Sequence, residues 1–136
     1  MQPVPINIWA LLVAALAKMV VGMIWYSPAM FLKPWMKLVG RSLEDMKAGM
    51  AKGLTTDAIG ALVMAFVLVH AVRYAGATSA AQGAAVGFFN WLGFVAVVTL
   101  TIAVYEKRPF KLFVINNGYQ LVSMLIMGAI LAVWRP

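Results

Sequence analysis

The chain has 136 residues, of which 64% are hydrophobic and 11% are charged, and its mean hydropathy is +0.91. Because soluble globular domains are only about half apolar, this composition excludes that class and indicates one small membrane domain over residues 1–136. The net charge of +7 comes from basic residues in short loops beside apolar runs, which favours anionic lipid over nucleic acid as a partner. The absence of cysteine excludes cysteine-ligated zinc and iron–sulfur sites.

The first apolar run, residues 6–25, has about the ~20 residues that a helix needs to cross a bilayer. Lys18 is the only full charge within it, and a charge at that depth is costly. Trp25 and Tyr26 follow as aromatic rings do at headgroup level, and Pro28 ends the helix. No basic region precedes the run, so we expect a retained transmembrane helix and not a cleaved signal peptide.

Residues 29–52 predict helices that lie along the membrane surface. Phe31 and Trp35 fall on one side of the first helix and its lysines on another, which is typical of an interfacial helix. Ser42, followed three residues later by an aspartate, is a capping signal for a second short helix. We expect Gly53 to close this connection.

Three further apolar runs each predict a transmembrane helix: residues 55–73, 79–105 and 110–134. Thr55 or Thr56 is a natural N-cap for the first of them, with Asp57 in its first turn. Four crossings result, so the predicted fold is an all-α integral membrane protein.

A small-residue seam marks the start of the third span. Its members are Ser79, Gly83 and Gly87, at four-residue spacing. Such a seam lets helix backbones approach closely in a membrane. It predicts close packing, either within the fold or against another chain.

The basic residues predict the orientation. Eight of the eleven Lys and Arg residues fall on one side of the four-span topology: Lys33, Lys37, Arg41, Lys47, Lys52, Lys107, Arg108 and Lys111. Arg73 and Arg135 fall on the other side. The positive-inside rule predicts that the eight lie in the cytoplasm and that both termini lie outside it.

Several polar residues of the spans fall at a similar depth, at a rise of ~1.5 Å per helical residue. The candidates for a ligand or ion path are Lys18, Asp57, Asn116, Asn117, Gln120 and Ser123. A lysine that extends toward the cytoplasm would approach Asp57, and pairing would offset part of the desolvation cost. The alternative is structural: Asp57 complements the helix dipole, and the asparagines join helices.

Other features point to chemistry less directly. The expected interface anchors are Trp25, Tyr26, Phe31, Trp35 and Trp134. His70, the only histidine, falls near the far end of the second span, and haem ligation would need another ligand. A Schiff base on Lys18 would need a large chromophore, for which four short helices offer little room. No phosphate loop, nucleophile elbow or metal-binding histidine pair is present, so we predict no catalytic residue and no metal site, and the sequence implies no particular cofactor.

Four blocks carry a family resemblance: WYSPAMFLKPWM, MAFVLVH, WLGFV and INNGYQLVSMLIMGAIL. They resemble the recurrent blocks of a bacterial family of small four-helix membrane proteins, domain of unknown function family 1761. The blocks at Trp25–Pro28 and Asn117–Tyr119 are the most specific parts. The resemblance implies the four-helix fold and a bacterial inner membrane, and it implies no activity and no functional residues.

Two function classes remain. The first is non-enzymatic binding or transport of a small molecule or ion by an oligomeric helical bundle. The second is an accessory or assembly subunit docked on a larger energy-transducing or biosynthetic membrane complex. Because four thin helices leave little space within one chain, we expect a homo-oligomer or a larger complex.

Overall fold

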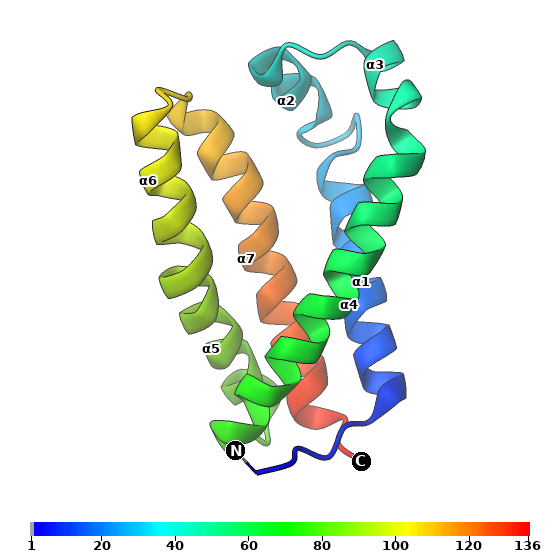
Figure 1. The fold of residues 1–136 in the computed structure, drawn as a ribbon, viewed down its shortest axis with the longest axis vertical. Helices are drawn as coiled ribbons and strands as arrows, with labels where there is room; N and C mark the ends of the chain where they lie inside the picture. The colour runs from blue at the N-terminus through cyan, green and yellow to red at the C-terminus, as the bar shows by residue number, and fades with distance from the viewer. Residues whose placement is uncertain (1) are drawn as a thin grey trace.

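The structure, a computed structural model, describes residues 2–136, and these residues form an all-helical bundle (Figure 1). The elements are α1 (Ile8–Trp25), α2 (Leu32–Val39), α3 (Leu43–Ala48), α4 (Met50–Tyr74), α5 (Ala80–Trp91), the π-helical segment η1 (Leu92–Ala96), α6 (Val97–Tyr105) and α7 (Phe110–Val133). Four rods are long and apolar enough to cross a membrane, the third being the continuous run Ala80–Tyr105. The predicted four-span all-α fold is confirmed, and the chain is a membrane protein.

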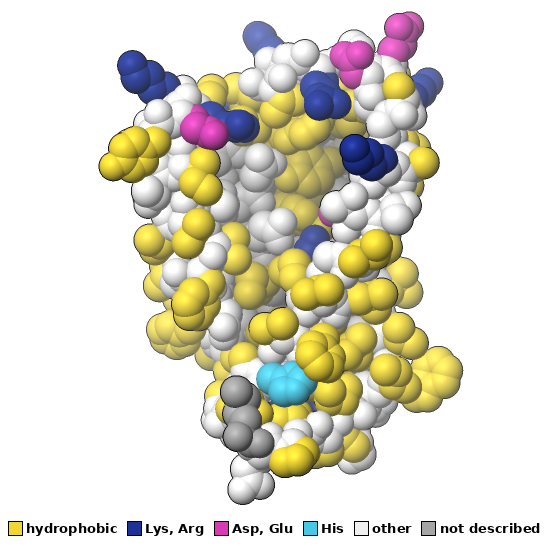
Figure 2. Space-filling view, viewed as in Figure 1, with side chains coloured by type: hydrophobic (Ala, Val, Ile, Leu, Met, Phe, Trp, Pro, Cys, Tyr) yellow, Lys and Arg dark blue, Asp and Glu magenta, His cyan; other side chains and the backbone are white. Residues whose placement is uncertain are grey.

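The two ends of the bundle differ in charge. One end carries α2, α3 and the turn between α6 and α7, and the eight basic residues predicted to lie on one side belong to it (Figures 1 and 2). We call it the basic end. The other end holds both chain termini together with Arg73 and Arg135, and we call it the terminal end (Figure 1).

Helix α7 lies at the centre of the bundle and packs against α1, α4 and α5 (Figure 1). The core fills the half of the bundle nearest the terminal end, and it consists largely of alanines from α1 and α4 with larger side chains from α4 and α7. Its members include Ala10, Ala14, Ala61, Ala65, Val69, Val72, Met127 and Leu131. Small side chains allow the three helices to approach closely, which compensates for the weak hydrophobic driving force between helices in lipid.

The predicted small-residue seam lies between α5 and α7. A Cβ atom on Gly83 would come within 2.1 Å of the carbonyl oxygen of Gly128, and one on Gly87 within 2.1 Å of the carbonyl oxygen of Met124. Ser79 is the N-cap of α5, and its hydroxyl accepts a hydrogen bond from the Gln82 backbone N–H at 3.2 Å. The small-residue seam therefore forms a close helix–helix contact within one chain, between α5 and α7.

The second span begins earlier than predicted, because α4 starts at Met50 and contains Gly53 in its first turn. The expected N-caps are also wrong: Thr55 and Thr56 lie inside the helix and donate their hydroxyls to backbone carbonyls four residues back, at 2.8 and 2.7 Å. These back-bonds satisfy the hydroxyls within a helix, so threonine does not end it. Asp57 consequently lies two turns into α4, beyond the first turn in which the helix dipole acts.

The predicted surface segment contains α2 and α3. Helix α3 begins with a capping box, in which the Ser42 hydroxyl accepts from the Asp45 N–H at 3.1 Å and the Asp45 carboxylate accepts from the Ser42 N–H at 3.0 Å. Hydrogen bonds from the Ser42 backbone, and then from its side chain, hold the pKa of the Asp45 carboxyl below its usual range.

We expect this capping box to weaken on acidification. Because the pKa of Asp45 is lower in the folded than in the unfolded chain, the carboxylate stabilises the start of α3 above the usual value of about 3.9, and this contribution is lost as the pH falls through the lowered value. The measurement is an NMR titration of the Asp45 carboxyl carbon. Replacing Ser42 with alanine removes the side-chain hydrogen bond and keeps the backbone one, so the pKa should rise only part of the way toward about 3.9. Equal values in the two proteins would contradict the prediction.

Candidate functional site

A cavity of about 1810 Å³ occupies the half of the bundle nearest the basic end. Its lining comes from all four spans and from α2 and α3. Figure 2 shows it as a hollow in one face of the molecule, below the rim of charged side chains. Four short helices therefore enclose a large space within a single chain.

The cavity exists because helices that pack closely at the terminal end diverge toward the basic end. Helix α5 lies on α7 through the glycine seam, whereas α6, beyond the π-helical segment η1, makes far less contact with α7. Helix α4 approaches α5 near the terminal end and leans away from α6 at the other end (Figure 1). Figure 2, in the same view, shows that the cavity opens on the side between α4 and α6.

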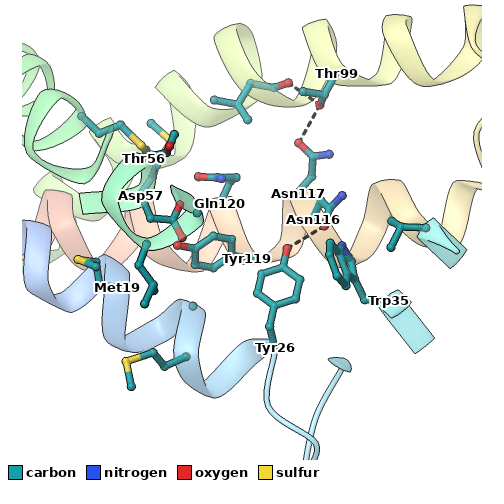
Figure 3. Close-up of a pocket in the computed structure, with 18 of the residues that line it drawn as sticks. Met19, Tyr26, Trp35, Thr56, Asp57, Thr99, Asn116, Asn117, Tyr119 and Gln120 are labelled. Carbon is teal, nitrogen blue, oxygen red and sulfur yellow. Dashed lines mark hydrogen bonds between the residues drawn. The ribbon is translucent and has the colours of Figure 1, made fainter. Parts of the chain in front are cut away.

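Two polar side chains face this cavity without a partner. Within residues 2–136, neither the Asp57 carboxylate nor the Gln120 amide forms a hydrogen bond or an ion pair, and both groups line the cavity (Figure 3). Asp57 comes from α4 and Gln120 from α7. The cavity wall therefore offers a negatively charged acceptor and an amide that is both donor and acceptor.

The two asparagines of α7 have partners. The Tyr26 hydroxyl donates to Asn116 Oδ1 at 2.7 Å, and Thr99 Oγ1 lies 2.8 Å from Asn117 Oδ1 (Figure 3). The Trp91 indole donates to the Asn117 carbonyl oxygen at 3.0 Å. Asn117 is buried, so it joins the third span to α7 and offers little to a ligand, while Asn116 stays in the wall.

Tyr26, which follows α1, is held in its protonated form. Burial raises the pKa of its hydroxyl, and the nearby Tyr119 and Asp57 raise it further. A neutral hydroxyl can donate to Asn116, which is the bond observed.

Lys18 is buried, 4% exposed, and its partner is Tyr119. The Lys18 ammonium donates to the Tyr119 hydroxyl at 2.8 Å and lies 4.7 Å from the ring centroid. The Tyr119 hydroxyl in turn lies 3.3 Å from the Lys18 carbonyl oxygen, to which it donates. Among the described residues Lys18 has no carboxylate within 4.0 Å, so the expected pair with Asp57 is not formed.

Tyr119 is the site residue that sequence reasoning missed. It lines the cavity, with Asp57 beside it (Figure 3), whereas Lys18, its hydrogen-bond partner, is not part of the lining. Its position three residues after Asn116 and one before Gln120 places it on the polar face of α7. That spacing is a signal from which it could have been found.

Ser123, the last of the predicted path candidates on α7, does not line the cavity. Asn116 and Gln120 line the cavity, but Ser123 is fully buried, and its hydroxyl has no hydrogen-bond partner within residues 2–136. The reason is that α5 lies directly on α7 at the neighbouring Met124 and closes the cavity there. Ser123 therefore belongs to the packed core and not to a path.

Most of the predicted interface anchors pack inside the chain. The Trp25 indole donates to the Ile115 carbonyl oxygen at 2.9 Å, and its ring lies 4.9 Å from that of Phe31. Tyr26 packs edge-on against Trp35, with ring centroids 5.8 Å apart, and Trp35 lines the cavity. These rings tie α2 to α7. Trp134, at the terminal end, is exposed.

His70 lies apart from the cavity. It is in the part of α4 nearest the terminal end, and its Nδ1 is 2.7 Å from the carbonyl oxygen of Phe66, one turn earlier on the same helix. In the described part of the chain, no three His, Cys, Asp or Glu side chains come together as a metal site would require.

Comparison with known proteins gives a family and no further relative. The model of a family described as a protein of unknown function, DUF1761, matches residues 9–132. This match confirms the resemblance noted in the four sequence blocks. No curated protein and no solved structure matches the chain.

Proposed function

The chain belongs to the DUF1761 family, whose description names no activity, and we propose from its geometry that it is a non-enzymatic membrane protein that binds a small molecule in the cavity at its basic end. We further propose that it resides in a bacterial inner membrane with the basic end in the cytoplasm and both termini outside. The charge difference between the two ends supports this orientation.

The observation that carries the proposal is the pair of unpartnered polar groups in the cavity. Asp57 lies about 10 Å along α4 from Met50, at a rise of ~1.5 Å per residue, so it sits below the surface end of the helix. Asp57 is exposed to the cavity and Gln120 is half-buried, so both groups are open to a ligand. A hydrogen bond to a charged group contributes roughly 1.5–3 kcal/mol net, and a ligand that bonds Asp57 and Gln120 would gain stabilisation of this order.

The closed terminal half supports binding over a continuous channel. The cavity lining reaches Leu68 and Met124, and beyond them the core side chains of α1, α4 and α7 are fully packed. Transport would require this packed half to open.

Filling the cavity should remove the ligand. Val63 lines the cavity on α4, whereas Ile59, one turn away on the same helix, is equally exposed and does not line it. After gentle extraction, native mass spectrometry should find a reproducible small-molecule mass on the parent and on Ile59→Trp, and none on Val63→Trp. A parent protein that carries no such mass, or a mass that persists on Val63→Trp, would overturn the proposal.

The same measurement tests the second function class. Recovery in stoichiometric amount with a larger complex, without a small-molecule mass, would favour the accessory-subunit reading. The sequence predicts little space within one chain, whereas residues of a single chain line the cavity. A homo-oligomer is therefore not needed to build the site. The number of chains in the intact protein follows directly from its mass in the same experiment.

A further inference from the structure

We propose that the ligand is a single-chain anionic lipid with a free hydroxyl next to its charged group, and that it enters sideways from the bilayer between α4 and α6. This inference rests on the proposed function of the cavity. It follows from three zones of the lining, which succeed one another from the basic end toward the middle of the bundle.

The first zone is a basic rim. Arg41, Lys52 and Arg108 line the mouth of the cavity, whereas Asp45 is the acidic residue there. Asp45 is engaged in the capping box of α3, and Arg108 is paired with Glu106. Within residues 2–136, neither Arg41 nor Lys52 forms an ion pair within 4.0 Å, although the Arg41 charge lies close enough to act on Asp45, so both side chains can bind an anionic group such as a phosphate or carboxylate.

The second zone is the polar wall formed by Asp57, Gln120 and Asn116. An ionised carboxylate can only accept hydrogen bonds, and it repels a second anion. The part of the ligand that reaches Asp57 must therefore be a donor, and a hydroxyl between the anionic group and the chain meets this requirement. The glycerol backbone of a phospholipid has two oxygens that can carry acyl chains. In a diacyl phospholipid both are esterified and cannot donate a hydrogen bond, whereas a lysophospholipid keeps one of them as a free hydroxyl.

The third zone is apolar. Met64, Val67, Leu68, Phe94 and Met124 line the inner part of the cavity. Val67 is ten residues beyond Asp57 on α4, which corresponds to ~15 Å at 1.5 Å per residue and equals half of the ~30 Å hydrocarbon thickness. The apolar zone thus matches the depth that one acyl chain occupies in one leaflet.

The open side explains how such a molecule would reach the site. Figure 2 shows the cavity as a hollow that opens between α4 and α6, and Val67 and Phe94 of the apolar zone are exposed to the region that lipid tails occupy around the bundle. A water-soluble anion could enter the cavity through its mouth at the basic end and would not need a side opening. The side opening and the apolar zone together favour an amphiphile.

The test compares four probes by native mass spectrometry of the delipidated full chain in detergent. They are lysophosphatidylglycerol, lysophosphatidylcholine, a diacyl phosphatidylglycerol and glycerol 3-phosphate. We expect lysophosphatidylglycerol to bind about tenfold or more tightly than lysophosphatidylcholine, because the rim bears two unpaired cations. We expect the diacyl lipid and glycerol 3-phosphate to bind more weakly than lysophosphatidylglycerol. The diacyl lipid lacks the hydroxyl between phosphate and acyl chain, since its two head-group hydroxyls lie beyond the phosphate, and glycerol 3-phosphate lacks the chain.

Matched variants locate the effect. The double variant Arg41→Gln and Lys52→Gln should lose the preference for the anionic probe, whereas Lys37→Gln with Lys47→Gln, from the same surface segment but outside the lining, should keep it. Tighter binding of glycerol 3-phosphate or of the zwitterionic lipid would overturn this inference and leave the proposed function standing. Failure of all four probes, on a protein that also carries no small-molecule mass from its host membrane, would overturn both.

Discussion

Replacing Gly83 with alanine is expected to destabilise the bundle by roughly 3 kcal/mol, the upper end of the range for overpacking. The added Cβ would lie 2.1 Å from the Gly128 carbonyl oxygen and 2.6 Å from the Ala132 side chain. Because the nearest atom belongs to the backbone of α7, no change of side-chain rotamer can relieve the clash, and the two helices must separate. Thermal unfolding in detergent, followed by circular dichroism, measures the loss.

Gly60 provides the control for this prediction. It lies inside α4, and a Cβ there would meet nothing within 4 Å. Alanine is favoured over glycine in a helix interior by about 1 kcal/mol, so Gly60→Ala should be as stable as the parent or more so. If Gly83→Ala unfolded at the same temperature as Gly60→Ala, α5 and α7 would have to lie farther apart than in this structure.

Replacing Tyr119 with phenylalanine is expected to destabilise the protein by about 3 kcal/mol, since it leaves the buried Lys18 ammonium without its hydrogen-bond acceptor. The aromatic ring stays, so the cation–π contact is retained and only the hydroxyl is lost. Chemical unfolding of the purified protein in mixed micelles measures the change.

Lys18→Met resolves the cause in a double-mutant cycle. A methionine of similar length places no charge in the core, so the second substitution, Tyr119→Phe, should cost much less in its presence than alone. Equal costs in both backgrounds would show that the two side chains are not coupled. The cycle concerns folding, because Lys18 does not line the cavity.

Hydropathy and charge were sufficient to predict the four spans, the surface segment and the different character of the two ends. The boundaries failed where local signals are ambiguous: Gly53, Thr55 and Thr56 read as the break before a helix, yet they lie within α4. Threonine bonds its hydroxyl to the preceding turn, and an exposed glycine weakens a helix without ending it.

The sequence predicts how far along its helix each candidate side chain lies, but it does not predict which neighbouring helix that side chain faces. The rise per residue places Lys18 and Asp57 at one level, and both do lie in the half of the bundle with the cavity or at its edge. Whether they face each other depends on the rotation of α1 and α4 about their axes, which tertiary packing sets. Lys18 bonds the Tyr119 hydroxyl and no carboxylate, so a lysine–tyrosine hydrogen bond stands in place of the expected ion pair.

The π-helical segment η1 changes which side of the third span faces α7 beyond it. In an uninterrupted α-helix, Thr99 would point about 120° away from Gly87, twelve residues earlier, at 100° per residue. One residue absorbed by the wide turn reduces this offset to about 20°. The same side of the rod therefore faces α7 twice, through glycine where the helices touch and through Thr99, bonded to Asn117, where they part. A single extra residue thus keeps the rod in register with α7 across the whole membrane while the cavity opens beside it.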